Sequence, residues 1–177
     1  LDLALDASGR PALVYVLRNE QENVAVFWRP PENPSPAGHP GATPRTSVRL
    51  AFNGPVPYVV TDLDFRSERG ADLWLVTGNE RKEWNDAARI PAGPHATLNA
   101  PLSLDVSQRG EVVLAAEAPD RAIHVARSPG GREWPRKLMR KFEGHSPDIA
   151  LVEGGAVVLG FAGESAIWFW REPPPEP

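Results

Sequence analysis

The chain is built from repeats, because one strand ending returns along its length. Three stretches finish an apolar run with arginine: Ala25-Val26-Phe27-Trp28-Arg29, Ile123-His124-Val125-Ala126-Arg127 and Ile167-Trp168-Phe169-Trp170-Arg171. A fourth stretch, Leu73-Trp74-Leu75-Val76-Thr77, fits without the arginine. Successive copies lie about 44–50 residues apart, which is the size of one small antiparallel sheet in a toroidal array. The repeat therefore constrains the architecture far more than the activity.

Each repeat reads as a meander of short β-rich runs divided by turns. The first repeat turns at Ser8-Gly9-Arg10, and the third and fourth align with it strand by strand, turning at Gln108-Arg109-Gly110 and Gly154-Gly155. The second repeat has clear strands at 59–65 and 73–77, while the run 47–52 could close repeat one or open repeat two. The strands are almost continuously apolar, as expected when neighbouring sheets cover both faces.

We therefore predict an all-β fold, a β-propeller of about four antiparallel blades. Residues 1–171 form a single domain with a Pro-rich insertion at 30–45, followed by a Pro-rich tail at 172–177. Prolines at that density predict extended backbone without ladder hydrogen bonds. Propellers hold about 4 to 8 blades. Repeat four reaches the tail after its third strand, and nothing before Leu1 could supply a missing outer strand, so we expect an incomplete or partner-completed ring.

Composition supports one globular domain and excludes several function classes. The 177 residues are 41% hydrophobic with six Trp, enough for a core. The net charge of −4, with both signs interspersed, argues against nucleic acid, and no apolar run approaches the ~20 residues that span a bilayer. There is no cysteine, P-loop, dinucleotide-binding glycine motif or Gly-x-Ser-x-Gly elbow, so we expect no cofactor. The four scattered histidines likewise predict no metal centre.

Two hairpin sequences follow third strands and share an aromatic residue at the same distance. They are Arg127-Ser128-Pro129-Gly130-Gly131-Arg132-Glu133-Trp134 and Thr77-Gly78-Asn79-Glu80-Arg81-Lys82-Glu83-Trp84. Such a turn needs a residue with positive φ, which Gly131 supplies, and an aromatic that packs back into the fold, which Trp134 and Trp84 supply. Both resemble a degenerate Asp-box, the S/T-x-D-x-G-x-x-W/F hairpin of sialidase-like (BNR-repeat) propellers. The first has Arg127 for Ser/Thr and Pro129 for Asp.

The resemblance implies a structural role for the boxes themselves and an extracellular or periplasmic location. For an active site it implies an arginine triad, a Tyr/Glu pair and an acid/base Asp near the ring axis. Arg29, Arg127 and Arg171 occupy one repeat-equivalent position and could converge on an anion. Alternatively, each arginine pairs with a neighbouring turn or rests on an adjacent tryptophan. The loop residues Trp84 and Trp134 are further candidates for ligand contact.

Three aspartates follow leucines that we place at equivalent first-strand ends: Asp6, Asp64 and Asp105. They could cap the glycine turns through backbone N–H groups, or ring the axial mouth and bind a cation. Tyr15 and Tyr58 lie in apolar runs and are expected to pack in the core rather than act as nucleophiles.

Two functions fit these features. The first is a non-catalytic propeller module that binds carbohydrate or protein surfaces. The second is part of a sialidase-like glycoside hydrolase propeller. In either case the open edges predict self-association or additional blades.

Overall fold

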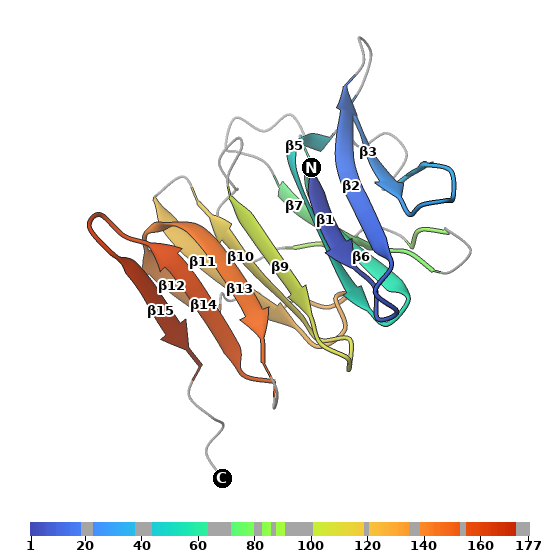
Figure 1. Ribbon diagram of the computed structural model, residues 1–177. Helices are drawn as coiled ribbons and strands as arrows, with labels where there is room; N and C mark the ends of the chain where they lie inside the picture. Colours follow the sequence, from blue (N-terminus) through green and yellow to red (C-terminus); the bar gives the residue numbers. More distant parts are fainter. Residues whose placement is uncertain are drawn as a thin grey trace.

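The computed structural model describes residues 1–18, 23–37, 44–63, 72–79, 83–85, 88–90, 101–118, 121–134, 139–152 and 155–172. These residues form fifteen strands in four antiparallel sheets (Figure 1), which confirms the all-β prediction. No helix in these ranges is long and apolar enough to cross a membrane. The four sheets stack as successive blades and do not close into a ring.

Strands follow one another through each sheet in chain order, so every blade is a meander. Blade 1 contains β1 (Asp2–Leu5), β2 (Pro11–Arg18), β3 (Asn23–Trp28) and β4 (Ser35–Pro36). Blade 2 contains β5 (Pro44–Asn53), β6 (Val56–Leu63), β7 (Asp72–Thr77) and β8 (Ala88–Arg89). Blade 3 contains β9 (Leu102–Val106), β10 (Val112–Glu117), β11 (Ala122–Ser128) and β12 (Arg140–Glu143). Blade 4 contains β13 (His145–Leu151), β14 (Val157–Ala162) and β15 (Ile167–Arg171).

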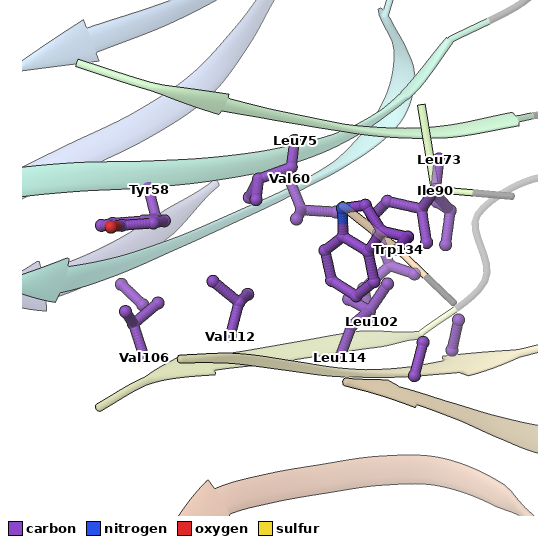
Figure 2. Packing of buried hydrophobic residues seen from close by; sticks show 13 residues of the cluster. Tyr58, Val60, Leu73, Leu75, Ile90, Leu102, Val106, Val112, Leu114 and Trp134 are labelled. Carbon is purple, nitrogen blue, oxygen red and sulfur yellow. The ribbon is translucent and has the colours of Figure 1, made fainter. Parts of the chain in front are cut away.

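The core consists of three apolar layers, one between each pair of neighbouring blades. Alternate residues of a second strand enter different layers, so Val59 packs toward blade 1 and Val60 toward blade 3. Figure 2 shows the middle layer, where Tyr58 is buried as expected and Leu114 packs beneath Trp134. Burying one such aliphatic side chain contributes roughly 1.5–3 kcal/mol. The continuous apolar strands are therefore explained by burial on both faces.

The structure settles the ambiguous second repeat. Residues 47–52 belong to β5, so they open blade 2 rather than close blade 1. Leu63 ends β6, a second strand, so our alignment of Leu63-Asp64-Phe65 with first-strand ends is wrong. Asp64 itself lies outside the described residues.

The Pro-rich stretch contributes an outer strand, contrary to our prediction that it makes no ladder hydrogen bonds. Ser35 and Pro36 pair with β3, and the Ala37 N–H donates to the Ala25 carbonyl at 2.7 Å. Proline is tolerated here because β4 is an edge strand.

Candidate functional site

The turn between the first and second strands is built alike in blades 1, 3 and 4. Its glycine has a positive φ of 78°, 79° or 80° at Gly9, Gly110 and Gly155. Each glycine donates its N–H to the carbonyl three residues earlier, at 2.8–2.9 Å. A left-handed backbone costs glycine little, which explains its recurrence. We call these segments the first turns.

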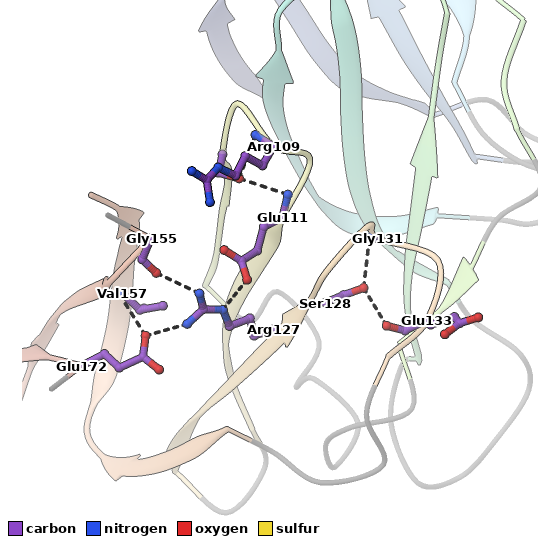
Figure 3. A network of polar contacts seen from close by, with 10 residues as sticks. Arg109, Glu111, Arg127, Ser128, Gly131, Glu133, Gly155, Val157 and Glu172 are labelled. Carbon is purple, nitrogen blue, oxygen red and sulfur yellow. Dashed lines mark hydrogen bonds and ion pairs between the residues drawn. The ribbon is translucent and has the colours of Figure 1, made fainter. Parts of the chain in front are cut away.

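Arg127 connects the first turns of blades 3 and 4 (Figure 3). Its Nε donates to Glu111 at 2.7 Å, its Nη1 to Glu172 at 2.6 Å and its Nη2 to the Gly155 carbonyl at 2.9 Å. The Arg127 side chain is 27% exposed. The hydrogen bond that Arg127 donates to the Glu111 carboxylate is the main reason that the pKa of Arg127 is raised, so the guanidinium remains charged.

A pocket of about 820 Å³ opens between blades 3 and 4 beside this network. Its polar wall comes mostly from the first turn of blade 3, and its apolar wall from the ends of β9 and β13. The lining residues are Asp105, Val106, Ser107, Gln108, Arg109, Glu111, Arg127, Leu151, Val152 and Gly155. Ligand pockets typically occupy about 300–1,000 Å³, so this one has room for a small ligand.

The other two arginines lie at different places in the array. Arg29 is 8% exposed, donates to the Pro55 carbonyl of blade 2 at 3.1 Å and lies over the rings of Phe27 and Phe52. Arg171 is exposed on β15. Arg29 and Arg127 thus reach into two different blade junctions, and Arg171 lies on the exposed strand β15. The contacts of Arg29 and Arg127 with a turn of the next blade agree with the alternative expectation, but the rings beneath Arg29 are Phe27 and Phe52 rather than the adjacent tryptophan.

The hairpin after β11 has the predicted form. Gly131 has a φ of 72°, and Trp134 is 8% exposed with its Nε1 donating to the Gly131 carbonyl at 3.0 Å. Both expectations for this turn are confirmed. The hydroxyl that fixes the turn comes from Ser128, one residue after Arg127, because it accepts the Gly131 N–H at 2.9 Å and donates to the Glu133 carbonyl at 2.7 Å.

The corresponding residues after β7 also serve packing. Gly78 and Trp84 form an isolated β-bridge, and the Trp84 ring meets Phe27 edge-on at 5.5 Å. Asn79 accepts the Glu83 N–H at 3.0 Å through its side-chain oxygen. Trp134 is buried in the layer between blades 2 and 3, whereas Trp84 is partly buried against the layer between blades 1 and 2. Both rings therefore serve packing between blades.

Asp6 caps the first turn of blade 1, as one of our alternatives expected. Its Oδ1 accepts the N–H groups of Ser8 and Arg10 at 2.9 and 3.0 Å, and its Oδ2 meets Arg10 Nε at 3.0 Å. The hydroxyl of Ser8 adds a bond of 2.6 Å and is the main reason that the pKa of Asp6 lies well below its usual range.

Asp105 has a different role, because the equivalent cap in blade 3 is Ser107. The Ser107 hydroxyl accepts the N–H groups of Arg109 and Glu111, whereas Asp105 Oδ2 accepts the Leu151 N–H of blade 4 at 2.7 Å. Our alignment of Asp105 with Asp6 is therefore displaced by two residues. Within the described part of the chain, no group of three or more His, Asp or Glu side chains could hold a metal ion.

The chain matches no protein-family model and no curated protein. Among solved structures it is similar to the fucose-recognising lectin of Aleuria aurantia, a six-bladed β-propeller, at 8% identity and a TM-score of 0.62 over 96% of this chain and 56% of the lectin. A Trypanosoma rangeli sialidase matches at 14% identity and a TM-score of 0.60, over 96% of this chain and 35% of the enzyme. An endo-arabinase from Bacteroides thetaiotaomicron matches at 11% identity and a TM-score of 0.52, over 97% of this chain and 73% of the arabinase.

The chain thus spans little more than half the length of the lectin. At these identities the likeness concerns fold alone, and it shows that the four sheets are the blades of a β-propeller.

Proposed function

We propose that the chain is a non-catalytic β-propeller module that binds carbohydrate in the pocket between blades 3 and 4. The observation that carries this proposal is the mixed polar wall of that pocket, which combines a fixed guanidinium, a carboxylate and an amide within one turn and its neighbouring strand. Sugar hydroxyls both donate and accept hydrogen bonds, so they require a wall with both kinds of group.

The hydrogen-bonding capacity of that wall is partly used and partly available. A guanidinium has five N–H groups, and Arg127 spends three on Glu111, Glu172 and Gly155. Two N–H groups therefore stay available, held in fixed directions by the contacts of the other three. Arg109 and Gln108 are exposed on the same turn and add adaptable donors and an amide acceptor. Loops on a rigid scaffold are common positions for binding residues.

The fold neighbours are consistent with this proposal, since the Aleuria aurantia lectin is described in complex with a methyl fucoside. A protein partner is less well supported at this site, because protein interfaces usually bury an apolar centre, whereas most of this wall is polar. Glycoside hydrolysis is less well supported too, because Arg29, Arg127 and Arg171 lie apart and Tyr58 is buried in the core.

Calorimetric titration of the whole chain with methyl α-L-fucoside and with N-acetylneuraminic acid, guided by a glycan array, tests the proposal. Arg109→Ala should weaken the binding of the responding sugar about tenfold, because it removes a charged hydrogen-bond donor. The matched control is Arg132→Ala, which removes an exposed arginine outside the pocket and should leave affinity unchanged. The proposal is wrong if no glycan binds, or if Arg109→Ala binds as tightly as the wild type.

A further inference from the structure

Two kinds of hydrogen bond join blade 1 to blade 2 and recur between blades 3 and 4. In the first kind, the arginine at the end of a third strand donates to a carbonyl in the turn between the first and second strands of the next blade. Arg29 reaches Pro55 at 3.1 Å, and Arg127 reaches Gly155 at 2.9 Å. These contacts tie the outer part of one blade to the turn of the next.

In the second kind, a side-chain oxygen on a first strand accepts a backbone N–H from the first strand of the next blade. Asp2 accepts from Leu50 at 2.8 Å, and Ser103 accepts from Ile149 at 3.0 Å. Neighbouring first strands do not pair with each other as a ladder, so these side chains bridge between them.

The strand register shows that blade 4 also has an arginine on its third strand and a side-chain oxygen on its first strand at the same positions as blade 3. Ser103 pairs with Ala115 of the second strand, and Arg127 pairs with Val113, two residues earlier. In blade 4, Asp148 pairs with Gly160 and Arg171 pairs with Val158, again two residues earlier. Asp148 and Arg171 are therefore the blade 4 counterparts of a joined pair, and both are exposed. Asp148 Oδ1 accepts the Ser103 hydroxyl at 3.0 Å, and a carboxylate can accept a further N–H through its second oxygen.

The face that carries them has the apolar surface of a blade junction. Phe169 pairs with Gly160 and Ile167 with Ala162, which places these side chains on the face of Asp148. They are 78% and 72% exposed and line an open groove of about 430 Å³. We call this surface the blade 4 face.

The opposite end of the array offers the complementary groups. On β1, Asp2 and Ala4 face blade 2, so the alternating Leu3 and Leu5 face away and are 58% and 59% exposed. Leu17 of β2 is 52% exposed. We call this surface the blade 1 face.

The backbone of the blade 1 face also offers the N–H donor and the carbonyl acceptor that such a junction uses. The first turn there contains Gly9, whose φ and internal hydrogen bond match those of Gly155. Ile149, whose N–H bonds Ser103, lies six residues before Gly155, and Leu3 lies six residues before Gly9. The Leu3 N–H and the Gly9 carbonyl thus correspond to the two groups of blade 4 that blade 3 binds.

We propose that copies of this chain associate head to tail, with the blade 4 face of one copy docked on the blade 1 face of the next. Arg171 donates to the Gly9 carbonyl of the second copy, and Asp148 accepts its Leu3 N–H, while Phe169 and Ile167 cover the exposed leucines. The contact continues the blade junctions already present within the chain. Two copies supply eight blades, which is within the range of known propellers. If two copies do not close into a ring, the same head-to-tail contact would add further copies and give larger assemblies.

Sedimentation velocity of the whole chain over a wide concentration range tests this association. The expected result is a species of twice the 19.3 kDa chain mass, or a higher multiple, that grows with concentration. A single 19.3 kDa species up to hundreds of micromolar would overturn the proposal. Arg171→Ala should raise the dissociation constant about tenfold or more, whereas Arg132→Ala, on an exposed hairpin away from both faces, should leave it unchanged.

A mixing experiment tests the head-to-tail geometry separately. Phe169→Asp disables the blade 4 face and Leu3→Asp the blade 1 face, so each variant alone should be monomeric. Both side chains are mostly exposed, and circular dichroism with a thermal melt checks that each variant is folded. An equimolar mixture should form two-chain species, because each partner retains the face that the other lacks. Leu3→Asp that still self-associates, or a mixture that stays monomeric, would contradict the geometry.

Discussion

Arg127→Ala is expected to lower the free energy of unfolding by about 2–3 kcal/mol. The arginine makes three charge-assisted contacts of 2.6–2.9 Å, with Glu111, Glu172 and the Gly155 carbonyl. A hydrogen bond to a charged group contributes about 1.5–3 kcal/mol when buried, and an exposed ion pair about 0.2–1 kcal/mol. The three side chains are 25–27% exposed, so about 1 kcal/mol for each contact is a reasonable intermediate value.

Urea unfolding followed by circular dichroism measures this effect. With a slope of about 1–3 kcal/mol per molar urea, the midpoint should fall by roughly 1 M. A double-mutant cycle with Glu172→Ala isolates the contact between blades and should give a coupling of about 1 kcal/mol. Arg127→Lys keeps the charge but cannot match three separate acceptors, so its stability should lie between wild type and Arg127→Ala. An Arg127→Ala variant within 0.5 kcal/mol of wild type, or a cycle without coupling, would refute this reasoning.

Three further substitutions test the turns and the core. Gly131→Ala places a methyl group 2.8 Å from a neighbouring leucine methyl at a positive φ, so it should cost about 1–2 kcal/mol in urea unfolding, whereas Gly130→Ala meets open space and should be nearly neutral. Trp134→Ala should cost about 3–5 kcal/mol in the same assay, because it empties a buried site between blades 2 and 3. Asp6→Asn should lower the melting temperature at neutral pH. Because the pKa of Asp6 in the folded protein lies well below its usual range, the stabilisation is fully present above the usual aspartate pKa, and the difference from wild type should shrink progressively as the pH falls from that value toward the lowered pKa. A difference that stays constant over this acid range would contradict that assignment.

The repeat pattern predicts the all-β fold class and the division into blades well, because each blade is built from strands and turns that are close together in the sequence. The third-strand arginines were correctly aligned with one another. Their contacts were not predictable, because the partners Pro55 and Gly155 belong to the next blade and lie 26 and 28 residues away along the chain. Only the stacking of sheets brings these groups together.

The misalignment of Asp105 with Asp6 has an identifiable cause. Both aspartates follow a leucine, but Asp6 lies three residues before its turn glycine and Asp105 lies five residues before Gly110. Alignment on Gly9 and Gly110 places Ser107 opposite Asp6, and the hydrogen bonds of both turns agree with that alignment. The glycine is the better guide because its positive φ is a requirement of the turn, whereas several polar residues can cap it.

The two hairpin tryptophans show that a sequence motif alone does not tell whether an aromatic side chain packs in the fold or contacts a ligand. The expectation that Trp84 and Trp134 pack back into the fold is confirmed, and this packing buries the ring of Trp134 and part of the ring of Trp84. The pocket residues Gln108 and Arg109 were identified in the sequence only as parts of a turn, since nothing local distinguishes a turn beside a pocket from any other turn.

The most direct test of the account is a backbone amide NMR titration of the whole chain with the sugar that binds it. Binding in the proposed pocket predicts that shifts concentrate in the first turn of blade 3, from Ser107 to Glu111, and in the facing residues Leu151, Val152 and Gly155. Shifts confined to another junction, or no shifts with any sugar, would contradict the proposed site.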